Sequence, residues 1–447
     1  MKKFRVNRNF FIFSLLIFSL ILVSCEDFFH ITGNIINESN AYVDTEPVRI
    51  YIGGNFNYTM GASDREALVV TDGYGNFDYD FFNESQGGVY TDGSASKGIR
   101  SIELINDKIY IAGDFEGYRF DNVSPRDDNY QMMQRYSSDG SLDTLFTPLP
   151  AVSVTNANVY SLKPMNDNTI IIGGSFSGGI NSYLARINND GSENPTVPLI
   201  TTGTEVRSLY SDPDNNFLVI GGLFTNITPY AAQNLAVAAV ASSYLVLDPL
   251  DAATVLQAPV NSGISDIDIS LGGDLYLGGD NAGQGLIAKY EYNEGLSQFV
   301  FNADFENQFY NIELFRTDNT PPSPFNSVNV VKADLYGNVL VGGNFNDLQD
   351  FIGNKHNNIV RLLPSGMIDP SFRLDIDGPV YDIEIQQNGK ILVAGAFSMV
   401  NNNGIDRGIV RVETYGDIDW EFNTSLFPEA FGALGPIYTI AVQEQTE

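Results

Sequence analysis

The 447-residue sequence contains one cysteine, two histidines and one tryptophan, and its basic residues are few. A single cysteine excludes an intrachain disulfide framework and a thiolate metal cluster. Lys and Arg number 24 against 55 Asp and Glu, and the formal net charge of −31 disfavours nucleic acid and anionic lipid as partners. Stability must therefore come from a hydrophobic core, which a chain of this length can supply.

Catalytic signatures are also missing from the sequence. No Gly-x-Ser-x-Gly, His-Glu-x-x-His or Walker-type loop occurs. His30 and His356 stand in no nucleophile–base or metal-ligand pattern, and we expect His356 to lie in a solvated loop. We therefore predict a protein that is not an enzyme and that has no cofactor.

Acidic residues offer the two alternatives to that prediction. Close pairs such as Asp78/Asp80 and Asp266/Asp268 could serve glycoside hydrolysis, but in so acidic a chain solvated turn acids are the simpler interpretation. The segment Asp72–Asp80 has oxygen-bearing side chains at alternate positions, as a calcium site does. It departs from the EF-hand spacing and lacks the terminal Glu, so a turn is favoured over calcium.

Glycine, aromatic and β-branched residues are abundant and are arranged in a repeat. Its core is an apolar run that ends in two small residues, usually followed by Phe two positions later. The second small residue falls at positions 54, 113, 174, 222, 279, 343 and 395. The mean spacing of about 57 residues, with four short strands per unit, is typical of propeller blades. Small residues repeated inside a core strand indicate close backbone packing near a crowded axis.

The clearest copy of the repeat is Val380–Phe422. Asn388-Gly389 predicts a type I′ hairpin turn, because both central residues of such a turn need positive φ. The copy contains four strand-like runs, at Val380–Gln386, Lys390–Phe397, Gly408–Val412 and Ile418–Phe422.

The two ends of the chain predict how the ring closes. Pro436–Gln443 copies Pro379–Gln386, which is the first strand of a unit, whereas the core run at Ile50 has no such strand before it. The C-terminal strand should therefore complete the N-terminal blade and leave no free sheet edge there. We predict an all-β, seven-bladed β-propeller closed in this way, with an open β-solenoid or two smaller sheets as alternatives.

Three copies of the repeat resemble the delta-sixty repeat of bacterial surface proteins. They are Lys390–Phe422, Asn338–Phe372 and Lys108–Phe146, each with the core run, a central apolar run and an ending such as Gly-Asp-Ile-Asp-Trp-Glu-Phe. The resemblance covers roughly residues 48–447 and is degenerate in the fourth copy, where Ala231–Ala253 lacks the usual ending. It implies a propeller-like scaffold and brings no shared catalytic residues.

The N-terminus has the features of a lipoprotein signal. Met1–Ser24 combines a basic start with a 14-residue apolar run, which is shorter than the about 20 residues needed to span a bilayer. Leu22-Val-Ser-Cys25 resembles a lipobox, so we expect Cys25 to be acylated with fatty acids such as palmitate. An ordinary signal peptide is the alternative. Cleavage would leave 20 basic residues against 55 acidic ones.

Residues 25–46 are polar and without period, and we predict a flexible lipidated tether that leads to a propeller at 47–447. The acidic residues Glu26 and Asp27 after the cysteine resemble the mature N-termini of Bacteroidota outer-membrane lipoproteins. That resemblance implies a protein anchored to the outer membrane and facing the cell surface.

Loop lengths place the functional surface. The predicted turns on one face of the ring are tight, whereas the opposite face carries long connections such as Phe82–Gly98, Glu116–Tyr130, Asn302–Asn326 and Asn423–Gly435. Aromatic residues on ordered loops are typical interface anchors, although they can also fold under the loop as small satellite cores. The candidate partner-binding residues are Phe305, Phe309, Tyr310, Phe315, Phe325, Tyr118, Phe120 and Tyr130.

These observations predict a non-enzymatic, protein-binding scaffold or accessory subunit of an outer-membrane protein complex, which docks through its long-loop face. A glycan-binding or glycan-processing lipoprotein in nutrient uptake is the alternative, because aromatics that stack on sugars look similar in sequence. A carboxylate-based hydrolase is a third hypothesis, and it requires three or more acids that converge in one pocket.

Overall fold

The computed structural model describes most of the chain between residues 42 and 445. The described segments are 42, 45–60, 63–81, 88–91, 97–120, 125, 127–148, 158–177, 182–195, 200–212, 217–227, 233–241, 244–247, 263–281, 284–293, 298–305, 327–405, 408–426 and 435–445. No helix within these segments is both long and apolar enough to cross a bilayer.

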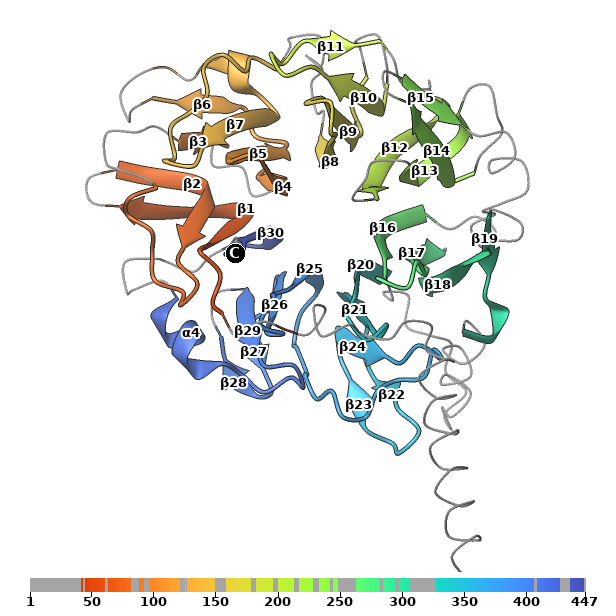
Figure 1. The fold of residues 1–447 in the computed structure, drawn as a ribbon. Helices are drawn as coiled ribbons and strands as arrows, with labels where there is room; N and C mark the ends of the chain where they lie inside the picture. Colours follow the sequence, from red (N-terminus) through yellow and green to blue (C-terminus); the bar gives the residue numbers. More distant parts are fainter. Residues whose placement is uncertain are drawn as a thin grey trace, which may run out of the picture.

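The main strands of the described segments form seven small antiparallel sheets, or blades, arranged in a ring (Figure 1). The second strand of every blade is one of the seven core runs, so the predicted number of blades is confirmed. The innermost strands of blades 1 to 7 are β30 (Ile437–Gln443), β4 (Ile99–Ile105), β8 (Val159–Pro164), β12 (Ile200–Ser211), β16 (Gly263–Ile269), β20 (Ser327–Ala333) and β25 (Val380–Ile385). The second strands are β1 (Arg49–Met60), β5 (Lys108–Gly113), β9 (Ile170–Gly174), β13 (Phe217–Ile227), β17 (Leu275–Asn281), β21 (Val339–Asn344) and β26 (Ile391–Gly395).

The outer part of each blade is less regular than the inner part. The third strands are β2 (Ser63–Thr71), β7 (Met133–Ser137), β10 (Leu184–Ile187), β14 (Leu235–Ala241), β18 (Gln284–Asn293), β24 (Ile359–Leu362) and β29 (Ile409–Val412). Fourth strands occur in blades 3, 4 and 5, as β11 (Glu193–Asn194), β15 (Tyr244–Leu247) and β19 (Gln298–Phe301).

The ring closes through the two ends of the chain, as predicted. Strand β30 pairs antiparallel with β1, with Ile440 opposite Ile52 and Val442 opposite Ile50. The last strand of the chain is thus the innermost strand of blade 1, whose other strands follow the N-terminal segment. Backbone hydrogen bonds between the two ends hold the ring shut.

The small residues of the core runs are explained by a close backbone approach. A Cβ atom on the second small residue of any run would lie between 2.0 and 2.4 Å from a backbone carbonyl oxygen at the start of the innermost strand of the same blade. For Gly395 the distance would be 2.1 Å, to the carbonyl of Pro379. Only glycine fits there, which confirms the prediction of tight backbone packing near the axis.

Two local predictions are wrong. The segment Ile418–Phe422 is not a fourth strand, because only a single bridge at Ile418 precedes helix α4 (Trp420–Ser425). Asp419 caps this helix and accepts a hydrogen bond from the Phe422 amide at 3.3 Å, and this turn directs Phe422 into the core. At Asn388-Gly389 only the glycine has positive φ, at 80°, so the turn is not type I′.

A buried arginine joins neighbouring blades on their outer side. In blade 7, Arg411 binds Asp419 with both Nε and Nη2, at 2.8 and 2.7 Å, and stacks over Phe422 at 4.3 Å. Its Nη1 donates to the carbonyl of Gly73 in blade 1 at 2.5 Å. We call this arrangement the arginine clasp. It recurs in blades 2 and 6, with Arg135, Asp143 and Phe146, and with Arg361, Asp369 and Phe372.

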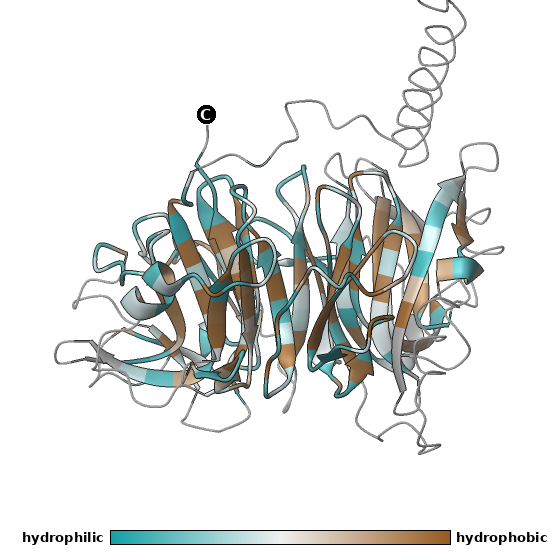
Figure 2. Cartoon of the chain, turned by 90° about the horizontal axis from the view of Figure 1, so that it is seen from below, coloured by the Kyte–Doolittle hydropathy of each residue, from teal (hydrophilic) through white to brown (hydrophobic). Residues whose placement is uncertain are grey.

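The ring has two different faces, and the N-terminal segment packs on one of them. Turns between first and second strands lie on one face, which we call the tight-turn face. The longer connections lie on the opposite face, which we call the long-loop face. Tyr42 packs against the tight turns of blades 6 and 7, with its ring 5.7 Å from that of Tyr336 and against Gly389. The C-terminal end of β30 lies on the same side (Figure 2). The accessory sheets β3–β6 (Gly88–Tyr90, Gly117–Arg119), β22–β23 (Leu348–Gln349, Lys355–His356) and β27–β28 (Met399–Val400, Asn403–Gly404), and the short helix η2 (Asp128–Tyr130), belong to the longer connections.

Candidate functional site

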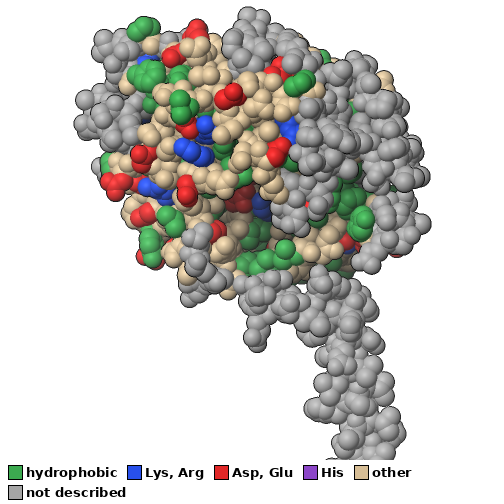
Figure 3. Space-filling view, turned by 45° about the horizontal axis from the view of Figure 1, so that its top comes forward, with side chains coloured by type: hydrophobic (Ala, Val, Ile, Leu, Met, Phe, Trp, Pro, Cys, Tyr) green, Lys and Arg blue, Asp and Glu red, His purple; other side chains and the backbone are tan. Residues whose placement is uncertain are grey.

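The central channel is a cavity of about 330 Å³ enclosed by the seven innermost strands. Every innermost strand has a β-bulge, near its start in all but β12, where it lies between Val206 and Ser208. A bulge can turn two successive side chains to the same side of a strand. The channel lining consequently has three levels. An oblique view shows acidic and basic side chains beside one another in the hollow at the middle of the ring (Figure 3).

The three levels differ in chemistry. The level nearest the long-loop face, the upper level, contains Arg100, Tyr160, Arg207, Ser265, Asn329, Tyr381 and Tyr438. The middle level contains Ser101, Ser161, Ser208, Asp266, Val330, Asp382 and Thr439. The level nearest the tight-turn face, the lower level, contains Glu103, Lys163, Tyr210, Asp268, Lys332 and Glu384.

Middle-level side chains tie four of the innermost strands to the next one. These side chains accept hydrogen bonds from backbone N–H groups of the neighbouring innermost strand, which are not used for pairing within that strand's own blade. Where Val330 occupies this level no such bond can form, and Asn329 instead donates to the carbonyl of Val380 at 2.9 Å. The four amide bonds are from Leu162 to Ser101 (3.4 Å), Leu209 to Ser161 (3.2 Å), Val331 to Asp266 (2.9 Å) and Ile440 to Asp382 (2.6 Å).

Most of the charged lining groups are paired. Lys332 binds Glu384 at 2.9 Å, and Lys163 binds Glu103. Outside the lining, Asp114 and Glu205 pair with the two upper-level arginines, Arg100 at 3.4 Å and Arg207 at 2.5 Å. Among the described residues, no Lys or Arg forms an ion pair with Asp266 or Asp382.

Burial changes the protonation of these acids. Desolvation raises the pKa of Asp266 to about 6. Desolvation, together with the neighbouring Glu384, raises the pKa of Asp382 to about 7. Burial alone would lower the pKa of Lys332, but Glu384 and Asp268 raise it overall, so this lysine stays charged. The channel therefore contains two carboxyl groups that gain or lose a proton near neutral pH.

The structure corrects the prediction for one of the acidic pairs. Asp266 and Asp268 are not solvated turn acids, because they lie on the innermost strand β16 and line the channel. The sequence could not separate these cases, because close acid pairs are common in a chain with 55 acids. Asp80, in contrast, lies exposed in a turn, and Asp78 binds Arg49 at 2.5 Å.

The segment considered for calcium forms a turn. The amides of Tyr74 and Asn76 both donate to Oδ1 of Asp72 at 2.9 Å. Among the described residues, no group of three or more His, Cys, Asp and Glu is arranged to hold a metal ion.

Three of the predicted interface aromatics are core residues. Phe305 is 1% exposed and packs on Tyr276, while Tyr118 and Tyr130 pack on each other at 3% and 5% exposure. The prediction of exposed anchors is corrected for these three, because their loops fold down over the blade and bury the rings. Phe120 is 44% exposed and remains accessible. The remaining candidates, Cys25, Phe309, Tyr310, Phe315 and Phe325, lie outside the described residues.

His356 is buried and not in a solvated loop, which corrects another prediction. It lies on β23 with 4% exposure, and its Nε2 is 3.6 Å from Oδ2 of Asp350. The two-stranded sheet β22–β23 encloses the histidine, and so short a hairpin has no clear sequence signal. Its turn places Phe351 and Ile352 at the tip, where they are 63% and 58% exposed.

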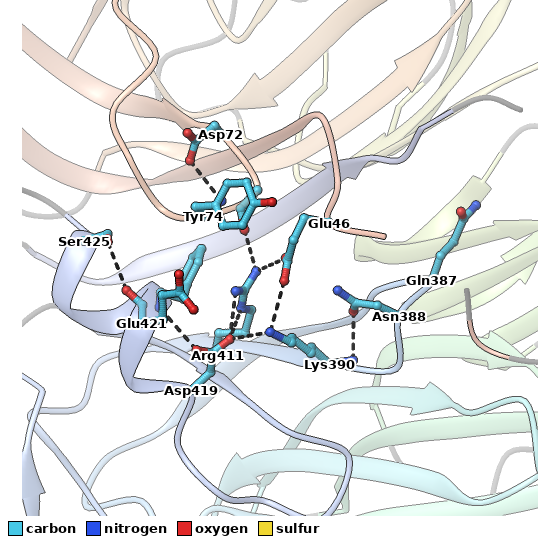
Figure 4. Close-up of polar contacts among 12 residues, drawn as sticks. Glu46, Asp72, Tyr74, Gln387, Asn388, Lys390, Arg411, Asp419, Glu421 and Ser425 are labelled. Carbon is cyan, nitrogen blue, oxygen red and sulfur yellow. Dashed lines mark hydrogen bonds and ion pairs between the residues drawn. The ribbon is translucent and has the colours of Figure 1, made fainter. Parts of the chain in front are cut away.

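The N-terminal segment adds an acid to the clasp of blade 7. Glu46 binds Nη1 of Arg411 at 2.6 Å and Nζ of Lys390 at 3.0 Å. Both cations also bind Asp419, so two carboxylates and two cations converge between blades 7 and 1 (Figure 4). The end of the predicted tether is thus bound to the ring at the seam where the chain closes.

Sequence reasoning missed the channel lining and the clasp. Polar residues at fixed positions after the first apolar residue of each innermost strand were the available signal for the lining. The Arg of the third strand, followed about eight residues later by Asp, was the signal for the clasp, as in Arg361/Asp369 and Arg411/Asp419. Their partners lie in other blades, which the repeat alone does not identify.

Comparisons with known proteins agree with this architecture. The sequence pattern described as "Domain of unknown function (DUF5122) beta-propeller" matches residues 166–196, 337–372 and 386–422. These stretches lie in blades 3, 6 and 7 and, in blades 6 and 7, include the clasp residues. No curated protein matches the chain.

Several solved structures are similar at low identity. Puromycin hydrolase is 12% identical with a TM-score of 0.41, over 81% of this chain and 49% of its own. A protein of unknown function from Bacteroides caccae is 10% identical with a TM-score of 0.37, over 89% of this chain and 100% of its own. Virginiamycin B lyase from Staphylococcus aureus is 11% identical with a TM-score of 0.38, over 73% and 87%. This chain spans about half the length of puromycin hydrolase, and similarities of this size carry no information about activity. The chain is a seven-bladed β-propeller with three stretches of the DUF5122 β-propeller pattern.

Proposed function

We propose that the protein is an outer-membrane lipoprotein, tethered at the cell surface, that acts as a non-enzymatic protein-binding scaffold or accessory subunit of an outer-membrane protein complex. The observation that carries the proposal is the position of the N-terminal segment. Tyr42 and Glu46 hold that segment on the tight-turn face. An acyl anchor at Cys25 would therefore keep the tight-turn face toward the membrane and leave the long-loop face free to dock.

Exposed apolar side chains on the longer connections support docking there. Phe351 and Ile352 form the tip of the β22–β23 hairpin, and Phe120 and Met399 are 44% and 42% exposed. Large apolar side chains of this kind, when they become buried against a partner, supply much of the binding energy at protein interfaces. They belong to blades 2, 6 and 7, so the docking surface includes the region around the closing seam.

The hydrogen bonding of the channel supports a non-enzymatic role. The acids do converge in one cavity, as a carboxylate-based hydrolase would require. However, Asp266 and Asp382 both accept amide hydrogen bonds from neighbouring blades, and Glu103 and Glu384 are paired with lysines. These contacts give the acids a role in holding the ring together.

The test is purification from detergent-solubilised membranes with a matched pair of surface variants. The double variant Phe351→Ser, Ile352→Ser alters the long-loop side, and Leu145→Ser with Tyr415→Ser alters exposed side chains near the tight turns. We expect a defined partner to co-purify with the wild type and with the tight-turn variant, and to be lost with the hairpin variant. Recovery of the protein alone in all three cases, or equal recovery of the partner with both variants, would contradict the proposal.

The membrane anchor is tested separately. Cys25→Ser should move the protein from the membrane fraction to the soluble fraction without changing its thermal stability, because residue 25 precedes the predicted propeller at 47–447. If the variant stays membrane-bound, the anchor is not an acyl group on Cys25.

A further inference from the structure

The central channel is polarised across the ring as well as along its axis. Its upper-level arginines come from blades 2 and 4, as Arg100 and Arg207. The middle-level carboxyl groups come from blades 5 and 7, as Asp266 and Asp382. The order of innermost strands around the ring puts blade 3 between the two arginines and blade 6 between the two carboxyl groups. Opposite charges thus face one another across the cavity.

The upper level of the channel also carries aromatic rings, on blades 7, 1 and 3. Tyr381 and Tyr438 are in ring contact at 5.5 Å, and the guanidinium of Arg100 lies 3.8 Å over the Tyr438 ring. Tyr160 lies on blade 3, between the two arginines. A guanidinium has five N–H donors, and Arg207 uses its Nε and Nη2 for Glu205, so its Nη1 can bind a second anion, which the charge of Arg100 also attracts. The arginine side can hold an anionic group, and the tyrosine rings of the upper level can contact the apolar body that carries it.

The acidic side has a surplus of negative charge. Lys332 and Lys163 each bind a lower-level glutamate, and neither binds a middle-level aspartate. Each oxygen of Asp382 accepts one backbone amide, from Ile440 at 2.6 Å or Ile383 at 2.8 Å, which leaves the second lone pair of each oxygen for another donor. A primary ammonium has three N–H donors and a positive charge, so it can both donate hydrogen bonds to these carboxylates and balance their charge.

We propose that the channel binds a small zwitterion, with its ammonium at Asp266 and Asp382 and its anionic group at Arg100 and Arg207. A cavity of about 330 Å³ is at the lower end of the range for ligand sites and suits a molecule between an amino acid and a dipeptide in size. The two charges of the ligand must be several bonds apart to reach both sides. This site is independent of docking through the long-loop face.

The test is isothermal titration calorimetry with a series of zwitterions of increasing length. The probes are glycine, 4-aminobutanoate, 6-aminohexanoate and glycylglycine, and hexylamine and hexanoate serve as controls with a single charge. We expect an optimum among the longer zwitterions and at least tenfold weaker binding of both single-charge controls. Absence of binding for the whole series, or equal binding of hexylamine, would overturn the proposal.

Variants on both sides of the channel distinguish the site from nonspecific binding. Asp382→Asn keeps an acceptor oxygen for the Ile440 amide but removes the charge, and Arg207→Gln removes the anion-binding charge on the opposite side. Each substitution should lower the affinity for the best-binding zwitterion at least tenfold, whereas Glu421→Gln on the exposed side of α4 should leave that affinity unchanged. Circular dichroism confirms that each variant is folded. Unchanged affinity in both channel variants would refute the assignment.

The pH dependence gives a further readout. Asp382 faces Glu384, Lys332 and Asp266, and Asp266 faces Asp268 and Ser208. No histidine lines the described channel, and burial raises the pKa of Asp266 to about 6 and that of Asp382 to about 7. Burial also raises the pKa of the neighbouring Asp268. Protonation removes their attraction for an ammonium, and affinity should fall several-fold from pH 8 to pH 5.5. Affinity that stays constant or rises over this range would contradict the proposal.

Discussion

Blades 7 and 4 have the same inner packing but different outer edges. In both, the second small residue of the core run lies against a backbone carbonyl, with Cβ distances of 2.1 Å for Gly395 and 2.4 Å for Gly222. Arg411 of blade 7 clasps Asp419 and the next blade, whereas the matching position in blade 4 is Val237. Val237 is 9% exposed and packs in an apolar cluster with Ile264 and Leu275 of blade 5. The inner ring therefore imposes one geometry, whereas the outer edge can be closed by either ions or apolar contacts.

In blades 1, 3 and 5 a basic residue also pairs with an acid at the outer side of the blade, but the paired residues come from other positions. Blades 3 and 5 keep a basic residue on the third strand, but the acid comes from the first tight turn instead of the blade ending. Blade 1 has Val70 at that position, and its arginine is moved to the start of β1, where Arg49 binds Asp78 and the carbonyl of Ser138 in blade 2. The pairs in blades 3 and 5 are Arg186 with Asp167 and Lys289 with Asp274.

The largest expected effect comes from breaking the clasp of blade 7. Arg411→Ala leaves Asp419 and Glu46 with Lys390 as their cation and leaves the carbonyl of Gly73 without a donor. Removal of one partner from a buried ion pair costs about 3–5 kcal/mol, and we expect a loss of this size in the free energy of unfolding measured with urea. The exposed Arg373→Ala, in the connection between blades 6 and 7, should change stability by less than about 0.5 kcal/mol. Equal losses in the two variants would show that the clasp does not stabilise the seam.

A smaller effect is expected where the two blades are alike. Gly395→Ala and Gly222→Ala each force a methyl group against a carbonyl, and we expect both to lose about 1–3 kcal/mol or more in the same urea titration. Gly404→Ala is the control, because no atom lies within 4 Å of its Cβ position. If Gly222→Ala were as mild as Gly404→Ala, then blade 4 would differ from blade 7 in its inner packing as well as its outer edge.

The same comparison explains what the sequence could predict. The number of blades and the closure of the ring could be predicted from local sequence patterns. The core run at Ile391–Gly395 and the copied strand at Ile437–Gln443 each indicate a β-strand without reference to distant residues. The ends of the blades did not follow, since Ile418–Phe422 has strand-like residues but Asp419 caps a helix there. The channel lining could not be predicted either, because the surroundings of Asp266 are formed by seven strands that are far apart in the sequence. Interactions between blades override local preference at these sites.

The middle-level residues of blades 7 and 4 also differ in their response to pH. Blade 7 has Asp382 where blade 4 has Ser208, and burial raises the pKa of Asp382 to about 7. Because the folded protein keeps a proton that the unfolded chain releases above about pH 4, stability should fall as pH rises from about 4 to about 7 and then level off. Asp419 acts in the opposite direction, because hydrogen bonds from Lys390 and the charge of Arg411 overcome its burial and lower its pKa, so its contribution is lost only in strong acid. Thermal melts should show this decline for the wild type and a flatter profile for Asp382→Asn. A profile that the substitution leaves unchanged would assign the pH dependence to other groups.

The smallest expected effect concerns the N-terminal segment, which has contacts with blade 7 and none with blade 4 among the described residues. Glu46 is part-exposed and shares Arg411 and Lys390 with Asp419, so Glu46→Gln removes a charge while Asp419 still compensates both cations. Partly exposed ion pairs contribute about 0–1 kcal/mol, and we expect a loss within that range. Limited proteolysis is the more sensitive measurement, because release of the segment from the tight-turn face should speed cleavage near residue 46 while the ring stays resistant. Tyr42→Ala should have the same effect if the two contacts act together. Cleavage at the wild-type rate in both variants would mean that neither contact holds the segment on the tight-turn face.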